Sequence, residues 1–314
     1  MLGKTANGLF WMYRQLERAE NIARLIETGQ RIALTRLGST EDEWRSVLQT
    51  SGCLAGYEAQ YGEEVTRDHA VDWLLRSKDN PGSVLSCIAQ ARQNARMVRT
   101  ALTTEVWEAT NTAYMTAKDG LSRKVADRDL PGVLRMLRQR TGMVRGTTHG
   151  TMLRNEIYDF ARIGTFLERA DNTARIIDVK YYVLLPTVAA VGSSIDNVQW
   201  EILLRSVSGR GGFRMAYGAQ MDPQSIAQFL ILDRRMPRSL AFCTAKIIDN
   251  LGYLSADYSS HCQCCLMAED MQQKYMRMTI DQVFDYGLHE YIQKVLGEIA
   301  AIGRQIEIDY RFYE

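Results

Sequence analysis

The sequence is poor in residues that interrupt helices, with five prolines in 314 residues. Proline lacks a backbone donor and is the strongest helix breaker, so long helices can form over most of the chain. Alternating β-branched runs with hairpin turns, the signature of strands, are also missing. Apolar residues recur instead at helical spacing nearly everywhere. We therefore predict an all-α fold.

A membrane-spanning segment is absent as well. The longest nearly uncharged apolar run, YYVLLPTVAAV at 181–191, is too short to cross a bilayer and is broken by Pro186. No apolar stretch of signal-peptide length precedes Arg14 and Glu17. We expect a cytoplasmic protein that does not bind membranes, in which the six cysteines are free thiols.

Neither sign of charge is in excess: 38 Lys and Arg residues face 37 Asp and Glu residues, a net charge of +1. No global field therefore favours nucleic acid or anionic lipid. Seven basic side chains gather at 123–145, but this stretch has no aromatic residue for base stacking. We interpret it as a solvated helix face and expect no nucleic acid partner.

Capping signals and apolar spacing together predict the helices. Asn80-Pro81 and Asp222-Pro223 place a capping side chain before a proline at the first helical position, and Pro237 can open a helix in the same way. Long helices are expected near 5–35, 81–102, 151–181 and 288–311, and shorter ones near 41–51, 63–76, 104–117, 131–142, 196–206, 223–233, 237–250 and 266–280.

One nine-residue string occurs twice. LERAENIAR begins at residue 16 and LERADNTAR at residue 167, and 16–27 matches 167–178 at eight of twelve positions. We infer two helical halves, 1–150 and 151–314, related by a pseudo-twofold axis and forming one compact bundle. A second series of matches pairs Trp44 with Trp200, Tyr61-Gly62 with Tyr217-Gly218, and Pro81, Ser83 and Cys87 with Pro237, Ser239 and Cys243.

The polar residues of each string share one helix face, because they stand at positions i, i+3, i+4 and i+7. We name these faces the first stripe (Glu17, Glu20, Asn21, Arg24) and the second stripe (Glu168, Asp171, Asn172, Arg175). Arg14 adds a turn to the first stripe, and Arg18 and Arg169 flank the two. These eleven residues, Arg14, Glu17, Arg18, Glu20, Asn21, Arg24, Glu168, Arg169, Asp171, Asn172 and Arg175, are the candidate binding residues.

The stripes have a structural and a functional interpretation. A salt-bridge network would hold the two helices together, although an exposed helical pair contributes only a few tenths of a kcal/mol. A polar pocket would instead bind carboxylate or phosphate through arginine, with Glu17 and Glu168 as candidate acid–base groups. Since no histidine shares these faces, the di-iron pattern of helical bundles is not met. We predict no metal and no cofactor.

Two other segments carry polar side chains. HCQCC at 261–265 lacks a second pair of metal ligands at suitable spacing, so we interpret it as a thiol-rich connector. RGTTHGT at 145–151 contains two glycines and His149, and we predict a flexible joint between the halves there.

Three segments, LFWMYRQLERAENIAR at 9–24, SVLSCIAQARQNAR at 83–96 and FARIGTFLERADNTARIIDVKYY at 160–182, resemble the alpha-E domain family of bacteria and archaea. The resemblance covers nearly the whole chain and implies an all-helical fold. The genes of such proteins typically neighbour circularly permuted ATP-grasp ligases and transglutaminase-like proteins. The family resemblance thus implies these two partners, a peptide substrate, and a role in forming or processing peptide or amide bonds.

The family pattern has an arginine three residues before each glutamate of the LER string. This chain has Arg14 at the first such position and Thr165 at the second. Arg162, about one turn earlier, is the candidate substitute.

Three functions are compatible with these observations. We rank highest a partner or substrate-binding component of an ATP-grasp-linked system. The alternatives are a stand-alone enzyme acting on a carboxylate or phosphate substrate, and a purely structural scaffold. The absence of a nucleophile–base pair in the sequence weighs against the stand-alone enzyme.

Overall fold

The computed structural model describes residues 1–33, 40–184, 194–219 and 221–313, and places the side chains of 1–31, 43–178, 199–219 and 221–313. Within these ranges every regular element is a helix, which confirms the predicted all-α class. No helix among them is both long enough and apolar enough to span a bilayer. Most of the apolar run at 181–191 lies outside the described residues.

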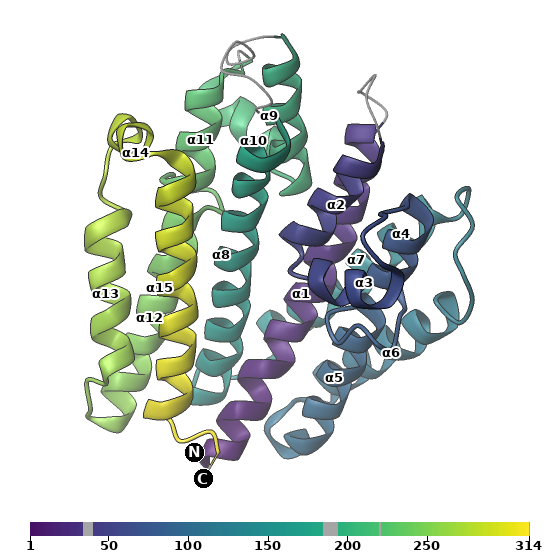
Figure 1. The fold of residues 1–314 in the computed structure, drawn as a ribbon. Coiled ribbons are helices and arrows are strands. Elements are labelled where there is room, and N and C mark those ends of the chain that lie inside the picture. Colours follow the sequence, from purple (N-terminus) through teal and green to yellow (C-terminus); the bar gives the residue numbers. More distant parts are fainter. Residues whose placement is uncertain (34–39, 185–193, 220, 314) are drawn as a thin grey trace.

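Two long helices, α1 (Gly3–Ala33) and α8 (Glu156–Leu184), lie side by side at the centre of the molecule (Figure 1). Their approach is close because a glycine stands at the contact. A Cβ added at Gly164 of α8 would lie 2.3 Å from the carbonyl oxygen of Phe10 on α1.

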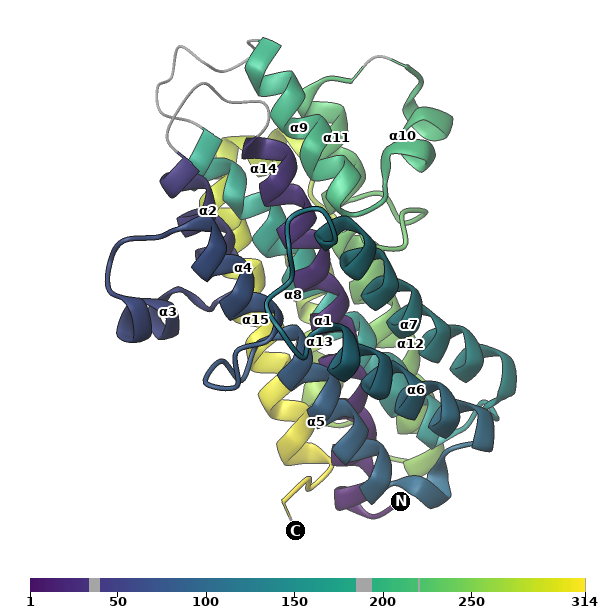
Figure 2. The same ribbon diagram turned by 90° about the vertical axis from the view of Figure 1, so that its right-hand side faces the viewer.

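Each central helix carries its own set of long helices (Figures 1 and 2). Helix α1 packs on α5 and α7, with α6 outside them, and α8 packs on α12 and α15, with α13 outside them. These helices are α5 (Val84–Met97), α6 (Thr104–Gly120), α7 (Leu130–Thr151), α12 (Leu240–Tyr258), α13 (Gln263–Tyr275) and α15 (Leu288–Asp309).

Shorter helices connect the long ones. Helices α3, α10 and α14 have no counterpart among the predicted elements, because seven or eight residues are too few for a periodic pattern. The short elements are α2 (Thr40–Thr50), α3 (Leu54–Tyr61), α4 (Arg67–Leu75), η1 (Arg99–Ala101), α9 (Ser194–Ser206), α10 (Arg210–Tyr217), α11 (Pro223–Ile231) and α14 (Ile280–Tyr286).

Helix starts follow the capping side chains. Asp222 accepts a hydrogen bond from Ser225 N and Pro223 opens α11, as predicted. Helices α5 and α12 begin three residues later than predicted, at residues 84 and 240. Their N-caps are Ser83 and Ser239, whose hydroxyls accept from the backbone of the third residue beyond.

The predicted joint at 145–151 is wrong, because α7 continues unbroken through it to Thr151. Val144 and Thr148 are buried and extend the apolar face of this helix. Thr148 donates to the carbonyl of Val144, as is common within helices. The chain turns only after Met152. His149 lies beside the Tyr158 hydroxyl, 2.9 Å away, and not at either stripe.

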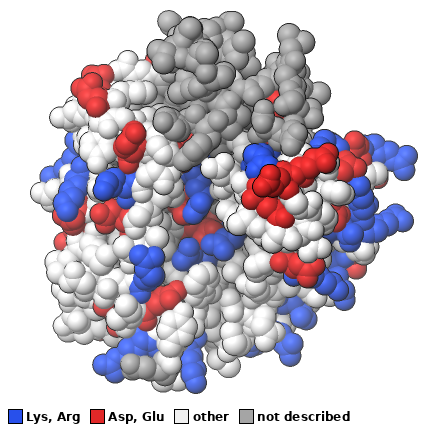
Figure 3. Space-filling view, viewed as in Figure 1, with Lys and Arg blue, Asp and Glu red and all other residues white. Residues whose placement is uncertain are grey.

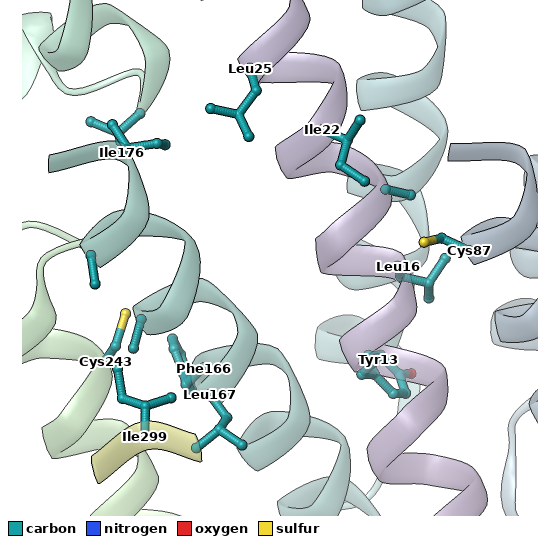
Figure 4. Packing of buried hydrophobic residues seen from close by; sticks show 14 of the residues in the cluster. Tyr13, Leu16, Ile22, Leu25, Cys87, Phe166, Leu167, Ile176, Cys243 and Ile299 are labelled. Atoms are coloured by element: carbon teal, nitrogen blue, oxygen red, sulfur yellow. The ribbon is translucent and has the colours of Figure 1, made fainter. Parts of the chain in front are cut away.

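Matched residues of the two halves make matched contacts. In Figure 4, Cys87 of α5 faces α1 near Leu16, and Cys243 of α12 lies against α8. Each thiol approaches the carbonyl oxygen of a proline six residues earlier, Pro81 or Pro237, at 3.9 Å. All six cysteines are free, as predicted. The pseudo-twofold axis and the division at residue 150 stay predictions.

Gly164→Ala tests the close approach of the central helices. The added methyl meets backbone rather than a movable side chain, so α1 and α8 must shift and we expect a loss of about 1–3 kcal/mol in the free energy of unfolding. Gly146→Ala is the matched control within a helix, because its Cβ would meet nothing within 4 Å. It should stabilise the protein by about 0.5–1 kcal/mol. Equal urea-denaturation midpoints for the two variants would contradict this packing.

Candidate functional site

The two LER strings exchange their charged partners across the α1–α8 contact. Arg169 binds Glu17 through two parallel contacts, Nε to Oε1 at 2.8 Å and Nη2 to Oε2 at 3.0 Å. Arg18 binds Glu168 in the same manner, with distances of 2.6 and 3.0 Å. Each glutamate is thus held by the arginine of the other string in the bidentate fork that favours carboxylate recognition. The four residues form a reciprocal ion-pair cluster.

Glu17 receives two further arginines and is 0% exposed. Arg145 of α7 places Nη1 3.2 Å from Oε2, and Arg238, which precedes α12, places Nη1 3.0 Å from Oε1. Three guanidinium groups therefore surround this one carboxylate.

Glu20 is enclosed in a similar way. It accepts hydrogen bonds from Arg24 at 2.8 Å, from Arg238 Nη2 at 2.7 Å and from the Thr141 hydroxyl at 3.2 Å, and it forms an ion pair with Arg145. The first stripe is thus sealed by arginines that arrive from α7 and from the α11–α12 connection.

The second stripe has fewer partners. Within the described part of the chain, Glu168 adds only Arg14, whose Nε lies 3.0 Å away, to its pair with Arg18. Asp171 pairs there with Arg175 alone, at 2.7 Å. Asn172 is buried, and among the described residues its Nδ2 atom has no hydrogen-bond partner.

The surrounding charges keep the glutamates of the first stripe ionised. Burial alone would raise the pKa of Glu17, but the guanidinium groups of Arg169, Arg238 and Arg145 outweigh it and hold the pKa well below its ordinary value. Burial and the charge of Glu17 also act to raise the pKa of Glu20, and the arginines lower it overall.

The same balance acts at Glu168, where burial is outweighed by Arg18 and Arg14 and the pKa is lowered. The effect on Arg238 is the opposite. Burial lowers its pKa to about 10, although the charge of Glu17 acts to raise it. Arg238 therefore stays protonated at neutral pH and faces Glu17 as a cation.

The second stripe borders a pocket of about 470 Å³ between α1, α8 and the α4–α5 connection. All four second-stripe residues line it, whereas Asn21 is the one first-stripe residue that does so. A neighbouring pocket of about 440 Å³ shares Thr50 and Arg175 with it and extends towards α15. Figure 3 shows acidic and basic side chains gathered in a hollow near the middle of this face of the molecule.

The structure brings together the eleven predicted site residues, but sequence reasoning missed Arg145 and Arg238. Arg145 lies in the stretch predicted to be a solvated face. Arg238 lies in a segment, 237–239, that matches 81–83, but at its position the other half has Gly82. The prediction that Arg162 replaces the missing arginine is wrong. Its guanidinium packs over the Phe166 ring, 4.4 Å from the centroid, and it forms no ion pair with any described residue. Arg145 and Arg238 reach Glu17 instead.

The HCQCC segment lies at the start of α13, which packs on α12 and α15. Cys264 and Cys265 are buried at the start of α13, and His261 lies 3.5 Å from Glu269. Across the described ranges, no three His, Cys, Asp or Glu side chains are grouped so that they could hold a metal ion.

A family described as "a predicted alpha-helical domain with a conserved ER motif", named Alpha-E, matches residues 1–310. This chain belongs to the Alpha-E family. In this Alpha-E protein the Glu-Arg dipeptide occurs in both LER strings, and its two residues form the reciprocal ion-pair cluster.

Two curated relatives are uncharacterized proteins, Mb2597 of Mycobacterium bovis and MT2643 of Mycobacterium tuberculosis. Each is 32% identical over 117 residues, which is 33% of this chain and 13% of the relative. The matched region is thus a small part of either relative. No solved structure matches this chain.

We expect Glu17→Gln to destabilise the protein strongly. Without the carboxylate charge, Arg169 and Arg238 lose their main counterion in a buried site, and such a loss typically costs about 3–5 kcal/mol. Asp171→Asn, at the position that corresponds to Glu20, is the comparison in the second stripe. The Asp171 side chain is 20% exposed and has one ion-pair partner among the described residues, so the cost should be below about 1 kcal/mol. Denaturant unfolding checks both values, and comparable losses would contradict the difference between the stripes.

Acid should unfold the protein through the same carboxylates. Because the folded pKa values of Glu17, Glu20 and Glu168 are lowered, their stabilisation is complete above the unfolded value of about 4.3 and is lost as pH falls through the folded values. Asp159 has the opposite sign: burial, then the charge of Asp257, raises its pKa to about 6. We expect the melting temperature to peak near pH 5 and to fall steeply below about pH 4. A flat profile down to pH 2.5 would refute this linkage.

Proposed function

We propose that this Alpha-E protein is a substrate-binding component of a system that forms or processes peptide or amide bonds, acting with an ATP-grasp-type ligase. A transglutaminase-like protein is a second partner in this proposal. The binding site is the pocket beside the second stripe. The observation that carries the proposal is the difference between the stripes, since the first is sealed by arginines and the second lines a pocket.

The shape of the site favours an extended ligand. The two pockets share Thr50 and Arg175 in their linings, so they are neighbours between the α4–α5 connection and α15, and we refer to the two together as the groove. Each has a volume within the usual range for small-molecule sites. A short peptide is long enough to use both pockets, which a single compact metabolite is not.

A binding role agrees better with the glutamates than acid–base catalysis does. A general acid or base at neutral pH needs a pKa near 7, whereas Glu17 and Glu168 have lowered pKa values and are held in bidentate pairs. The stand-alone enzyme is therefore the weaker alternative. The purely structural alternative accounts for the first stripe but leaves the pocket beside the second without a role.

Arg175→Gln tests the proposal in an assay with the ATP-grasp-type ligase of the source organism. We expect the wild-type chain to co-purify with the ligase and to raise its rate of amide-bond formation on a peptide substrate. The variant should lose at least about tenfold of this stimulation at limiting peptide concentration, because Arg175 stands where the two pockets meet.

Arg205→Gln is the matched control. Both arginines are 39% exposed and both pair with an acid four residues earlier, Asp171 or Glu201, but Arg205 lines neither part of the groove. Equal effects of the two variants, or a ligase that neither binds nor responds to the wild-type chain, would overturn the proposal.

A further inference from the structure

Arg238 places a guanidinium group against the acceptors of the first stripe. Its guanidinium donates from Nη1 to Glu17 at 3.0 Å and to Asn21 at 3.3 Å, and from Nη2 to Glu20 at 2.7 Å. Three of the four first-stripe residues are therefore acceptors for one planar cation. Arg238 itself is buried.

The corresponding position in the other half is Gly82. The segments Pro237-Arg238-Ser239 and Pro81-Gly82-Ser83 match in sequence, and in both the serine is an N-cap and the proline carbonyl faces a cysteine thiol. The two backbones thus have the same local arrangement. The difference is that residue 82 has no side chain.

The pocket lies where a side chain at residue 82 would point if it followed Arg238. Its lining includes Gly82 and the counterparts of all three Arg238 acceptors, namely Glu168, Asp171 and Asn172. Among the described residues no hydrogen bond reaches the side chain of Asn172, whereas Oδ1 of its counterpart Asn21 accepts one from Arg238. The Nδ2 atoms of both asparagines are buried without a partner, so the difference lies at the acceptor oxygen. An acceptor set that binds a guanidinium in one half is therefore left incomplete in the other.

Charge favours the same class of ligand. The pocket is lined by three carboxylates, Glu168, Asp171 and Asp79, and by two guanidinium groups, Arg18 and Arg175. The lining residues thus carry a formal charge of −1. A cation that donates several hydrogen bonds completes this set, and a guanidinium does so with planar geometry.

We propose that the pocket binds the guanidinium group of an arginine, either the free amino acid or a side chain within a peptide. The ligand supplies to the second stripe what Arg238 supplies to the first. This assignment rests on the proposed function, because it names the chemistry that the substrate-binding pocket selects.

L-Arginine and L-citrulline form the decisive ligand pair, because they have nearly the same shape but citrulline carries a neutral ureido group. Isothermal titration calorimetry with the full chain should give at least about tenfold tighter binding for arginine. Lysine should also bind more weakly, since its ammonium lacks the planar fork. Acetyl-arginine-amide and the peptide Gly-Arg-Gly distinguish the source: tighter binding than free arginine assigns a peptide ligand, and weaker binding assigns the amino acid.

Gly82→Arg supplies the guanidinium from the chain itself and should abolish arginine binding without lowering the melting temperature. Gly82→Ala is its control, because it adds the same Cβ, which meets Cys53 Sγ at 3.1 Å and Asn80 Oδ1 at 3.2 Å, without the guanidinium. That variant should still bind arginine. Should Gly82→Arg fold poorly, Asp171→Asn provides a second test, with an expected loss of about tenfold in arginine affinity.

Equal affinities for arginine and citrulline, or undiminished arginine binding by Asp171→Asn, would overturn the guanidinium assignment. Ligase stimulation that depends on Arg175 while arginine fails to bind would also refute this inference but leave the proposed function standing. Arginine binding with no effect on the ligase would support the guanidinium assignment and refute the proposed function.

Discussion

The exchange of Glu17 and Glu168 between Arg169 and Arg18 is the constraint on which the rest of the structure depends. Two buried carboxylates between helices are tolerated only when each is paired at hydrogen-bonding distance, here with a partly exposed arginine of the other string. That geometry requires α1 and α8 to approach closely, which explains the glycine at their contact, Gly164. Neither helix can satisfy its own ER dipeptide, so each half requires the other. Apolar packing around this pair then positions the outer helices.

The reciprocal pairing at Glu17 and Glu168 is not repeated along the rest of the two stripes. Arg145 and Arg238 both serve the first stripe, where they hold Glu17 and Glu20. Among the described residues Asp171 has one ion-pair partner, Arg175. The two stripes thus differ in the number of arginines that approach them, besides the change from Glu20 to Asp171. Both strings contribute to the central cluster, and the second stripe also lines a pocket.

The sequence predicted the helical class, most of the helices and the grouping of both stripes, because 3.6-residue periodicity and the near-copies are local signals. Arg145 and Arg238 escaped prediction because they reach Glu17 from 128 and 221 positions away in the chain. No local pattern encodes such a contact. The predicted joint at 145–151 is wrong because burial of Val144 and Thr148 holds the segment in α7 despite the low helix propensity of Gly146 and Gly150.

The difference between Gly82 and Arg238 therefore indicates a ligand class, which the identical residues around them do not. The matched residues Pro81 and Pro237, Ser83 and Ser239 fix two equivalent backbone segments beside the stripes. Against that common frame, glycine at 82 and arginine at 238 differ by one whole guanidinium group. Because Arg238 neutralises acceptors that the other half also possesses, its removal from a buried site would normally be costly. The glycine at 82 is tolerated because the second stripe faces a pocket, where solvent reaches the acceptors that Arg238 covers in the first stripe. Solvent access beside Gly82 thus permits a pocket at the place that the Arg238 side chain fills in the other half.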